Sequence, residues 1–242
     1  MTQQSRPYQI LKPKVIAAIP CYRTELYVGD VVSRAKKYVD QVIVVDDGSD
    51  DGTGEVAREA GALVIRHEKN RGYGEAIKSC FEAARSNGAD ILVTLDGDGQ
   101  HNPDEIPRVI SPILKGEANL VIGSRFLANE HSVPRYRKFG IGVITFLWNF
   151  GSKVKVSDTQ SGFRAYSKKV FESFPLREQG MAVSIEILEK ARKRGAVIKE
   201  VPISCVYVSS TINFKAIKHG LSVALSVIKI RLKNSLVRND NS

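Results

Sequence analysis

Apolar and polar positions in the first half of the chain alternate between two periods. Short apolar runs of strand length fall at 15–19, 41–45, 62–66, 91–95 and 119–122. Segments with helical spacing follow them, at 26–38, about 53–60, 72–86 and 103–115. Strands that alternate with helices predict a mostly parallel sheet with helices on both faces and right-handed crossovers. We therefore expect an α/β fold, with Ser49, Asp50 or Thr53 capping its second helix.

The pattern of the second half is less regular. We expect helices at 139–150 and 181–194, a strand at 163–167, and two short strands around Pro202 within 197–208. Residues 217–237 predict a long helix with one apolar and one basic face. Either that apolar face packs on the sheet, or the helix contacts a membrane surface. The predicted organisation is a tail (1–13), one large domain (14–212) and a basic amphipathic helix with its tail (213–242).

The stretch from Ile91 to Gln100 suggests a chemical site. A buried strand ends in Asp96-Gly97-Asp98-Gly99-Gln100, which places two carboxylates on alternate residues. Hard oxygen ligands suit Mg²⁺ or Mn²⁺, particularly a metal that also holds substrate phosphates. The two glycines would let a ligand approach the backbone. A solvated Asp-Gly turn is the plainer alternative. A calcium loop is excluded, because its sixth and twelfth positions would be His101 and Pro107.

Polar residues also follow the first two predicted strands. Asp46 and Asp47 end the second strand, and Pro20, Tyr22 and Glu25 follow the first. Ligands of open α/β sheets bind beyond the carboxyl ends of the strands. Three polar strand ends on one edge favour a nucleotide pocket over three unrelated turns.

Charge and composition limit the alternatives. The formal net charge is +10, and residues 190–242 contain eleven Lys or Arg and two acids, which suggests an anionic partner. The three cysteines lie far apart, as expected for reduced thiols of a cytosolic protein. The polar N-terminus lacks the apolar core of a signal peptide, and no run of about 18 apolar residues predicts a spanning helix. Dinucleotide, Walker and Ser-His-Asp spacings are not found.

Together, several motifs resemble those of family 2 glycosyltransferases with a GT-A fold, and most closely the dolichyl-phosphate mannose/glucose synthase branch. The motifs are Ile19-Pro20-Cys21-Tyr22-Arg23-Thr24-Glu25, Val44-Val45-Asp46-Asp47-Gly48-Ser49-Asp50-Asp51-Gly52-Thr53, Asn70-Arg71-Gly72-Tyr73-Gly74, Asp96-Gly97-Asp98-Gly99-Gln100-His101, Gly123-Ser124-Arg125 and Asp158-Thr159-Gln160-Ser161-Gly162-Phe163-Arg164. The resemblance covers about residues 14–215. One departure is that Arg23-Thr24 precedes Glu25, where the family usually has Asn-Glu directly after the tyrosine.

The resemblance implies a role for each matching position. The nucleobase and ribose pocket would be lined by Pro20, Tyr22, Glu25 and Asp47, with Asp46 supporting it. The metal and the donor diphosphate would be held by Asp96 and Asp98, with Gln100 as a further ligand. Phosphates of the donor or the acceptor would face Arg125 and Arg164. A divalent cation and arginine stabilise the diphosphate as it leaves.

The nature of the acceptor decides whether a base is needed. A polyprenyl phosphate is already an anion and needs only cations, for which the chain offers Arg125, Arg135, Arg137, Arg164 and Lys215. A hydroxyl acceptor would need a carboxylate to take its proton, with Asp158 the first candidate, Glu186 the second and Glu178 the third. We interpret the segment around Arg135 and Arg137, with His131, Ser132 and Pro134, as a mobile acceptor loop; a solvated charged loop is the alternative.

The sequence thus predicts an inverting glycosyltransferase that depends on Mg²⁺ or Mn²⁺. Its donor would be GDP-mannose or a UDP-sugar, and its acceptor dolichyl or undecaprenyl phosphate. The helix around Trp148 and the terminal helix would bring the enzyme to the cytoplasmic face of the membrane as a peripheral protein. A glycan-building transferase with a hydroxyl acceptor stays open.

Two further classes are less favoured by the residues. Binding of nucleic acid by the basic C-terminal region would require aromatic residues interleaved with the basic ones, and they are not interleaved there. A nucleotidyltransferase would have a glycine-rich basic loop after the first strand, where this chain has Pro20-Cys21-Tyr22-Arg23.

Overall fold

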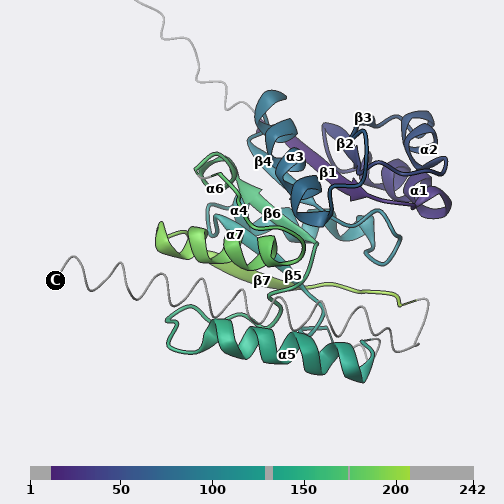
Figure 1. The fold of residues 1–242 in the computed structure, drawn as a ribbon. Coiled ribbons are helices and arrows are strands. Elements are labelled where there is room, and N and C mark those ends of the chain that lie inside the picture. The colour runs from purple at the N-terminus through teal and green to yellow at the C-terminus, as the bar shows by residue number, and fades with distance from the viewer. Residues whose placement is uncertain (1–11, 129–132, 174, 208–242) are drawn as a thin grey trace, which may run out of the picture.

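A seven-stranded sheet forms the centre of the computed structural model, which describes residues 12–128, 133–173 and 175–207. The strand order is β3-β2-β1-β4-β6-β5-β7 (Figure 1). The strands are β1 (Val15–Cys21), β2 (Gln41–Asp46), β3 (Leu63–Arg66), β4 (Ile91–Thr94), β5 (Leu120–Ser124), β6 (Arg164–Ser167) and β7 (Ile198–Pro202). The five strands predicted in the first half are all present, within two residues of their expected bounds.

Helices connect these strands. They are α1 (Glu25–Ala35), α2 (Thr53–Glu59), α3 (Tyr73–Ser86), α4 (Ile106–Leu114), α5 (Arg135–Asn149), α6 (Lys168–Phe171) and α7 (Ala182–Lys193), with a 3-10 turn, η1 (Pro103–Glu105), before α4. Strand and helix alternate through the first half, which confirms the α/β prediction.

The direction of β6 sets what lies at the functional edge. All the paired strands run parallel except β6, which is antiparallel to both β4 and β5. Its first residue, Arg164, pairs with Thr94, the last residue of β4. The start of β6 therefore lies at the same edge as the ends of β1, β2, β4 and β5, and the segment before Arg164 enters the site from that edge.

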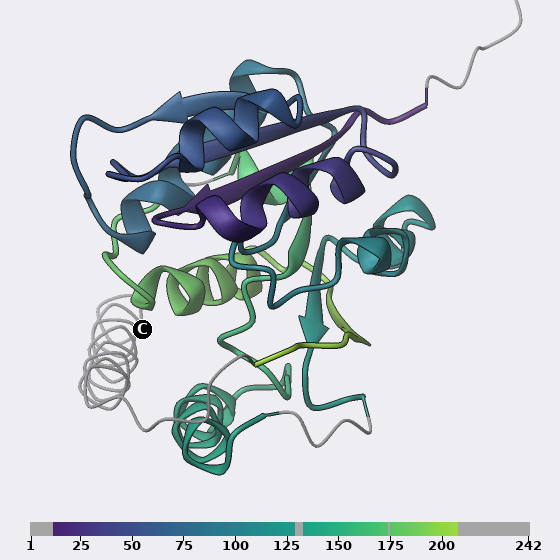
Figure 2. The ribbon, with the colours of Figure 1, turned by 90° about the vertical axis from the view of Figure 1, so that its right-hand side faces the viewer.

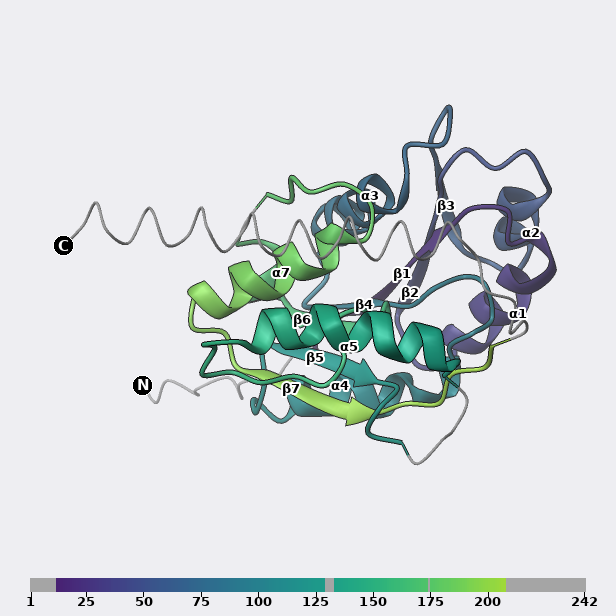
Figure 3. The same cartoon turned by 60° about the horizontal axis from the view of Figure 1, so that its bottom comes forward.

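Helices cover both faces of the sheet, as predicted. Along β1, Ile16 and Ala18 pack on the face covered by α3 and α7, whereas Val15, Ala17 and Ile19 pack on the face covered by α1 and α4. Neighbouring strand residues point to opposite faces, so one apolar strand serves two cores. Figure 2 shows α1 and α3 on opposite sides of β1, and Figure 3 shows α3 and α7 on the same side of the sheet.

Pro20 lies within β1, although the predicted first strand ends at residue 19. Its partner is Val45 of β2, while the pairing of β1 with β4 ends where Ala18 meets Thr94. Beyond Ala18, β1 has a neighbour on one side only. The N–H that proline lacks is therefore not required on the open side.

The start of α2 also differs from its prediction. None of Ser49, Asp50 and Thr53 is the N-cap, which is Gly52, and no side chain caps it. Asp51 instead accepts hydrogen bonds from the N–H and the hydroxyl of Thr53, at 3.1 and 2.5 Å. The hydroxyl oxygen of Thr53 accepts the N–H of Thr24 at 2.8 Å and so fixes the turn before α1.

Helix α5 starts earlier than its apolar pattern suggests. Arg135 and Arg137 lie in its first turn, directly after Pro134, so the prediction of a loop at these two residues is wrong. Proline suits this position, because it fixes φ at the helix entrance and the first N–H groups need no intrahelical partner.

Residues 197–208 also differ from the prediction. Up to residue 207, where the described part of this range ends, they contain one strand, β7, and an isolated bridge between Cys205 and His101, rather than two strands.

Several predicted features lie outside the described residues. These are most of the N-terminal tail, His131 and Ser132, and the C-terminal helix with Lys215. Across the described ranges, no helix combines the length and the apolar character that a bilayer crossing requires. Cys21, Cys80 and Cys205 are free and buried, which agrees with the prediction of unpaired thiols.

Candidate functional site

The carboxylate loop after β4 packs tightly on the end of β1. A Cβ on Gly97 would lie 2.3 Å from Sγ of Cys21, so only glycine fits here. Close packing on β1 is sufficient by itself to require this glycine. Gly99 has φ +75°, a backbone conformation that glycine adopts without strain.

Both aspartates of this loop have defined neighbours. The Asp98 carboxylate accepts the backbone N–H of Gln100 at 3.0 Å and its side-chain Nε2 at 2.7 Å. The backbone N–H of Asp96 donates to Nδ1 of His101 at 3.2 Å. The Asp96 carboxylate lies against Gly162, where a Cβ would come within 2.6 Å of its oxygen. Gly162 therefore leaves the space that Asp96 occupies.

The electrostatics of this loop favour a cation. Burial raises the pKa of Asp96 to about 6, against the opposing charges of Arg125 and Arg164. Burial and the neighbouring Asp96 charge raise the pKa of Asp98. Burial and Arg125 lower the pKa of His101 to about 4, so its ring is neutral at pH 7. Two carboxylates that resist ionisation together fit a divalent cation, whose charge would offset their repulsion.

The donor set is small. In the described ranges, no group of three His, Cys, Asp or Glu side chains is arranged to hold a metal ion. The candidate donors at this loop are the two carboxylates and the side-chain amide oxygen of Gln100. Mg²⁺ is commonly held in this way, by one or two carboxylates with water and substrate phosphates completing its coordination.

Arg125 and Asp158 form a buried ion pair across the edge. The guanidinium Nε and Nη2 each donate to one carboxylate oxygen at 2.7 Å, and the backbone N–H of Arg125 donates at 3.2 Å. Burial acts to raise the pKa of Asp158, but the charge and hydrogen bonds of Arg125 outweigh it and lower that pKa. Glu200 of β7 accepts the backbone N–H groups of Ser157 and Asp158, at 2.7 and 3.0 Å, and so fixes the loop.

A tyrosine connects this pair to helix α5. Arg125 Nη1 donates to the hydroxyl of Tyr207 at 3.1 Å. The guanidinium of Arg137 stacks over the ring of the same tyrosine, 5.1 Å from its centre. Burial raises the pKa of Tyr207 to about 12, so its hydroxyl stays protonated. Two of the arginines proposed for phosphate binding thus meet at one side chain.

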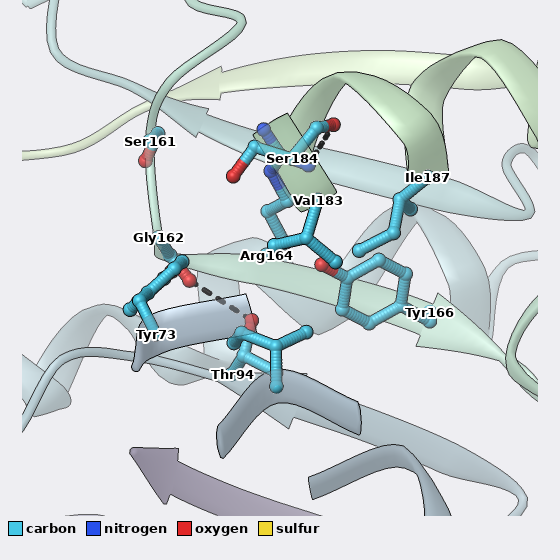
Figure 4. A pocket seen from close by; sticks show the side chains of 10 residues that line it. Tyr73, Thr94, Ser161, Gly162, Arg164, Tyr166, Val183, Ser184 and Ile187 are labelled. Atoms are coloured by element: carbon cyan, nitrogen blue, oxygen red, sulfur yellow. Dashed lines mark hydrogen bonds between the residues drawn. The ribbon is translucent and has the colours of Figure 1, made fainter. Parts of the chain in front are cut away.

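Arg164 does not face the solvent. Its side chain is 1 % exposed, and its guanidinium donates to the backbone carbonyls of Ser184 and Thr159 at 3.0 and 2.7 Å. Figure 4 shows it beside a small pocket between α3, β6 and α7, next to Gly162. We expected Arg164 to face a phosphate, but its side chain is buried. Its positive charge instead acts on the Asp96 carboxyl, whose pKa it lowers against the effect of burial.

The predicted nucleotide pocket lies at the ends of β1 and β2. Pro20 and Asp46 are buried, Tyr22 is 43 % exposed, and Glu25 is exposed at the first turn of α1. The Asp46 carboxylate accepts the N–H of Ser49 at 2.9 Å and turns the loop. Asp47, the fifth residue of this set, is 3 % exposed and accepts three hydrogen bonds within the protein.

The alternative bases fall outside this arrangement. Glu186 is buried on α7, accepts the backbone N–H groups of Arg177 and Glu178, and pairs with Lys190 at 2.6 Å. It fixes the segment before α7. Glu178 contributes its backbone to that contact.

Sequence reasoning missed three residues that shape the site. Glu200 lies inside a strand, and Tyr207 follows the last strand, so neither belongs to a recognisable motif. His67 directly follows β3 and is hydrogen-bonded to Asp47 at 2.7 Å. Applying the strand-end argument to the third strand, as to the first two, would have found His67.

The fold and its edge site define an α/β protein with a GT-A arrangement. The crystal structure of glucosyl-3-phosphoglycerate synthase from Mycobacterium tuberculosis, in complex with Mn²⁺, UDP and phosphoglyceric acid, matches with a TM-score of 0.73 at 22% identity, over 90% of this chain and 78% of that one. Mannosyl-3-phosphoglycerate synthase from Rubrobacter xylanophilus matches with a TM-score of 0.74 at 19% identity, over 92% and 75% of the two chains. At this identity the likeness shows the fold alone.

The chain belongs to glycosyl transferase family 2, whose model matches residues 16–174. It is 35% identical over 214 residues to UDP-N-acetylglucosamine–dolichyl-phosphate N-acetylglucosaminyltransferase of Methanococcus voltae, over 78% of this chain and 84% of that protein. It is 29% identical over 217 residues to dolichyl-phosphate hexose transferase of Haloferax volcanii, over 89% and 92% of the two. The resemblance inferred from the motifs is therefore confirmed at the level of the family and its dolichyl-phosphate branch.

Proposed function

We propose that this protein is an inverting, metal-dependent transferase that moves a hexose or an N-acetylhexosamine from a nucleoside-diphosphate sugar to a polyprenyl phosphate. The observation that carries the proposal is the buried pair of Arg125 and Asp158. The carboxylate first considered as a base is held by an arginine, with its pKa lowered. Such a site suits an acceptor that is already an anion and needs no base.

In the proposed reaction, an oxygen of the acceptor phosphate attacks the anomeric carbon from the face opposite the leaving group. The bond from that carbon to the donor diphosphate breaks, and its electron pair stays on the diphosphate oxygen. The products are an inverted polyprenyl-phosphate sugar and a nucleoside diphosphate. Arg125 and Arg137, which meet at Tyr207, would bind and orient the acceptor phosphate.

The metal site would consist of the carboxylates of Asp96 and Asp98 and the side-chain amide oxygen of Gln100. A bound Mg²⁺ or Mn²⁺ would supply the positive charge that stabilises the leaving diphosphate. Gln100 would also orient Asp98 through its two donated hydrogen bonds. Support comes from the raised pKa of both aspartates and from the Mn²⁺ in the solved glucosyl-3-phosphoglycerate synthase.

The names of relatives support the lipid acceptor. The proteins of Methanococcus voltae and Haloferax volcanii are named for transfer to dolichyl phosphate. Polyprenol monophosphomannose synthase of Mycolicibacterium smegmatis is 30% identical over 79% of this chain. A hydroxyl acceptor would instead need Asp158 released from Arg125, which the geometry does not favour.

The surface of α5 supports contact with a membrane. Phe139, Val143, Phe146 and Phe150 follow one helical stripe, and each is at least 40 % exposed. Lys138 and Lys153 are exposed near its two ends. An aromatic stripe with nearby cations suits the interface of an anionic bilayer, where a polyprenyl phosphate would be presented. This contact would hold the enzyme at a membrane surface as a peripheral protein.

The test is transfer of label from UDP- and GDP-sugars, with Mn²⁺ or Mg²⁺, to three acceptors in parallel: polyprenyl phosphate in detergent, phosphoglycerate and a free hexose. We expect label in the lipid, and loss of transfer in Asp98→Asn. The exposed surface variant Glu59→Gln should keep wild-type activity. Label found only in a soluble product would refute the lipid acceptor, and full activity of Asp98→Asn would refute the metal assignment.

A further inference from the structure

A chain of hydrogen bonds connects Asp47 to helix α3 through a buried histidine. His67 Nδ1 lies 2.7 Å from Oδ1 of Asp47, and its Nε2 lies 2.9 Å from the hydroxyl of Ser79. His67 is 7 % exposed, and its backbone N–H donates to the carbonyl of Asp46 at 2.9 Å. The ends of β2 and β3 and the middle of α3 are thus joined through one imidazole.

The hydrogen-bond partners define the orientation of the His67 ring. A carboxylate accepts hydrogen bonds, so Nδ1 is the donor in the contact with Asp47. Nε2 faces the hydroxyl of Ser79, which can donate or accept this hydrogen bond. The contact with Ser79 therefore helps to hold the ring in the orientation in which Nδ1 faces Asp47.

This arrangement has the order of a Ser-His-Asp triad but not its function. Ser79 lies in the interior of α3, where neighbouring N–H groups donate to carbonyls of the same helix. No backbone N–H there is free to stabilise an oxyanion beside the serine, as acyl transfer requires. The chain of hydrogen bonds instead acts on Asp47.

The remaining acceptor capacity of Asp47 points to a ligand. Its Oδ1 accepts His67 and the N–H of Arg71 at 2.9 Å; among the described residues, Oδ2 accepts one hydrogen bond, from the N–H of Gly72 at 2.7 Å. Gly72 has φ +89°, a backbone conformation that favours glycine. Oδ2 thus retains acceptor capacity while the protein holds the rest of the carboxylate in place.

We propose that His67, supported by Ser79, is a positioning residue that holds the Asp47 carboxylate in the orientation needed to accept the ring N–H of a uracil or guanine base. This inference rests on the proposed function, in which Asp47 lines the nucleobase pocket. Uracil and guanine present an N–H donor on the pairing edge, whereas cytosine and adenine present an unprotonated ring nitrogen there. An oriented carboxylate therefore attracts the first two bases and repels the last two.

Calorimetric titration of UDP, GDP, CDP and ADP, each with Mn²⁺, tests the proposal. Wild type should bind UDP or GDP more tightly than CDP and ADP. His67→Asn should keep this preference, because Nδ2 of asparagine can replace the Nδ1 donor. His67→Gln should weaken binding of the preferred nucleotide about tenfold, and Ser79→Ala about threefold. In the labelled-donor transfer assay, both variants should change kcat less than KM. Ser86→Ala, exposed at the end of α3, is the matched control.

The outcomes separate this proposal from the proposed function. If wild type binds none of the four nucleotides with Mn²⁺, the proposed function fails before any variant is compared. If wild type discriminates and a folded His67→Gln discriminates equally, the positioning role is overturned. If His67→Gln does not fold, Ser79→Ala decides: a discrimination ratio that falls towards one supports the proposal, and an unchanged ratio overturns it.

Discussion

Arg125, which follows β5, and Asp158, 33 residues later, form a bidentate ion pair in which the Nε–Oδ2 and Nη2–Oδ1 distances are both 2.7 Å. Asp158 is completely buried, and one tenth of the Arg125 side chain is exposed. Burying one of these charges without the other would be costly, because the desolvation would no longer be offset. The pair therefore holds the loop after α5 against the segment that follows β5.

Asp158→Asn should destabilise the protein by about 3–5 kcal/mol, since it leaves the Arg125 charge buried and uncompensated. Urea unfolding measures this change, and the double variant with Arg125→Gln should recover a large part of it. Comparing the loss of activity with the loss of stability distinguishes a positioning role of Asp158 from proton transfer. A loss of activity with no loss of stability would contradict our interpretation and restore Asp158 as a base.

The same pair predicts a pH dependence. The native pKa of Asp158 lies below its ordinary value of 3.8, so its ionised form stabilises the folded state. That contribution is complete at pH values well above 3.8 and is lost as the pH falls through the lower native pKa. The stability difference between wild type and Asp158→Asn should thus be constant from pH 6 to 8 and shrink below about pH 3.8. A difference that stays constant in acid would contradict the assigned shift.

Asp96 should behave in the opposite way. Its native pKa, about 6, is above its ordinary 3.8, so the metal-free protein gains stability from the protonated form at low pH and loses it as the pH rises through 6. In EDTA at pH 7.5, Asp96→Asn should be more stable than wild type by roughly 1 kcal/mol, allowing for solvent screening of a partly exposed group. Below pH 3.8 this advantage should vanish.

Thermal melts of wild type and Asp96→Asn across pH, with and without Mn²⁺, check this prediction. Mn²⁺ should raise the melting temperature of wild type and leave that of Asp96→Asn unchanged. A variant less stable than wild type at pH 7.5 in EDTA would show that Asp96 supports the fold rather than a cation.

The position of Gly97 against Cys21 predicts a compensating pair of substitutions. Gly97→Ala places a Cβ 2.3 Å from Sγ and should destabilise the protein by about 1–3 kcal/mol. Cys21→Ala removes the sulfur and should recover much of that cost in the double variant. Denaturant unfolding of the four proteins gives the coupling energy. If the two effects simply add, the contact between Gly97 and Cys21 is not the source of the strain.

The strands of the first half could be predicted because each is an apolar run bounded by polar residues or glycine, as in Ile91–Thr94. The convergence of Asp46 and Asp96 followed from the strand-end argument alone. The direction of β6 could not be predicted, because a four-residue strand carries no local signal for its orientation. Its reversal brings Arg164 to the edge, and packing against Ser184 of α7 then buries it. Contacts of this kind depend on residues distant in the sequence.

The same limit applies to Asp158 and to Arg137. The motif that contains Asp158 shows a carboxylate near the site, but its partner Arg125 is determined by the pairing of β5 with β6. For Arg137, polar neighbours suggested a loop, whereas Pro134 and the apolar residues that follow allow the helix to begin early. The ion pair of Asp158 and the stacking of Arg137 on Tyr207 both depend on tertiary packing, which the local pattern does not show.

The exposed stripe of α5 predicts that membrane binding and chemistry can be separated. Phe139 and Phe146 are 76 and 66 % exposed, so replacing them should cost little stability. Phe139→Gln and Phe146→Gln should each weaken binding to phosphatidylglycerol vesicles about tenfold, the fold-change expected from losing one buried aromatic contact. Transfer to a short-chain polyprenyl phosphate in detergent should be preserved. Vesicle sedimentation and the labelled-donor assay measure the two effects.

Leu114→Gln, half exposed on α4 over the opposite face of the sheet, is the matched control and should change neither vesicle binding nor transfer. Unchanged vesicle binding in a variant that combines Phe139→Gln with Phe146→Gln would show that this stripe is not the membrane contact.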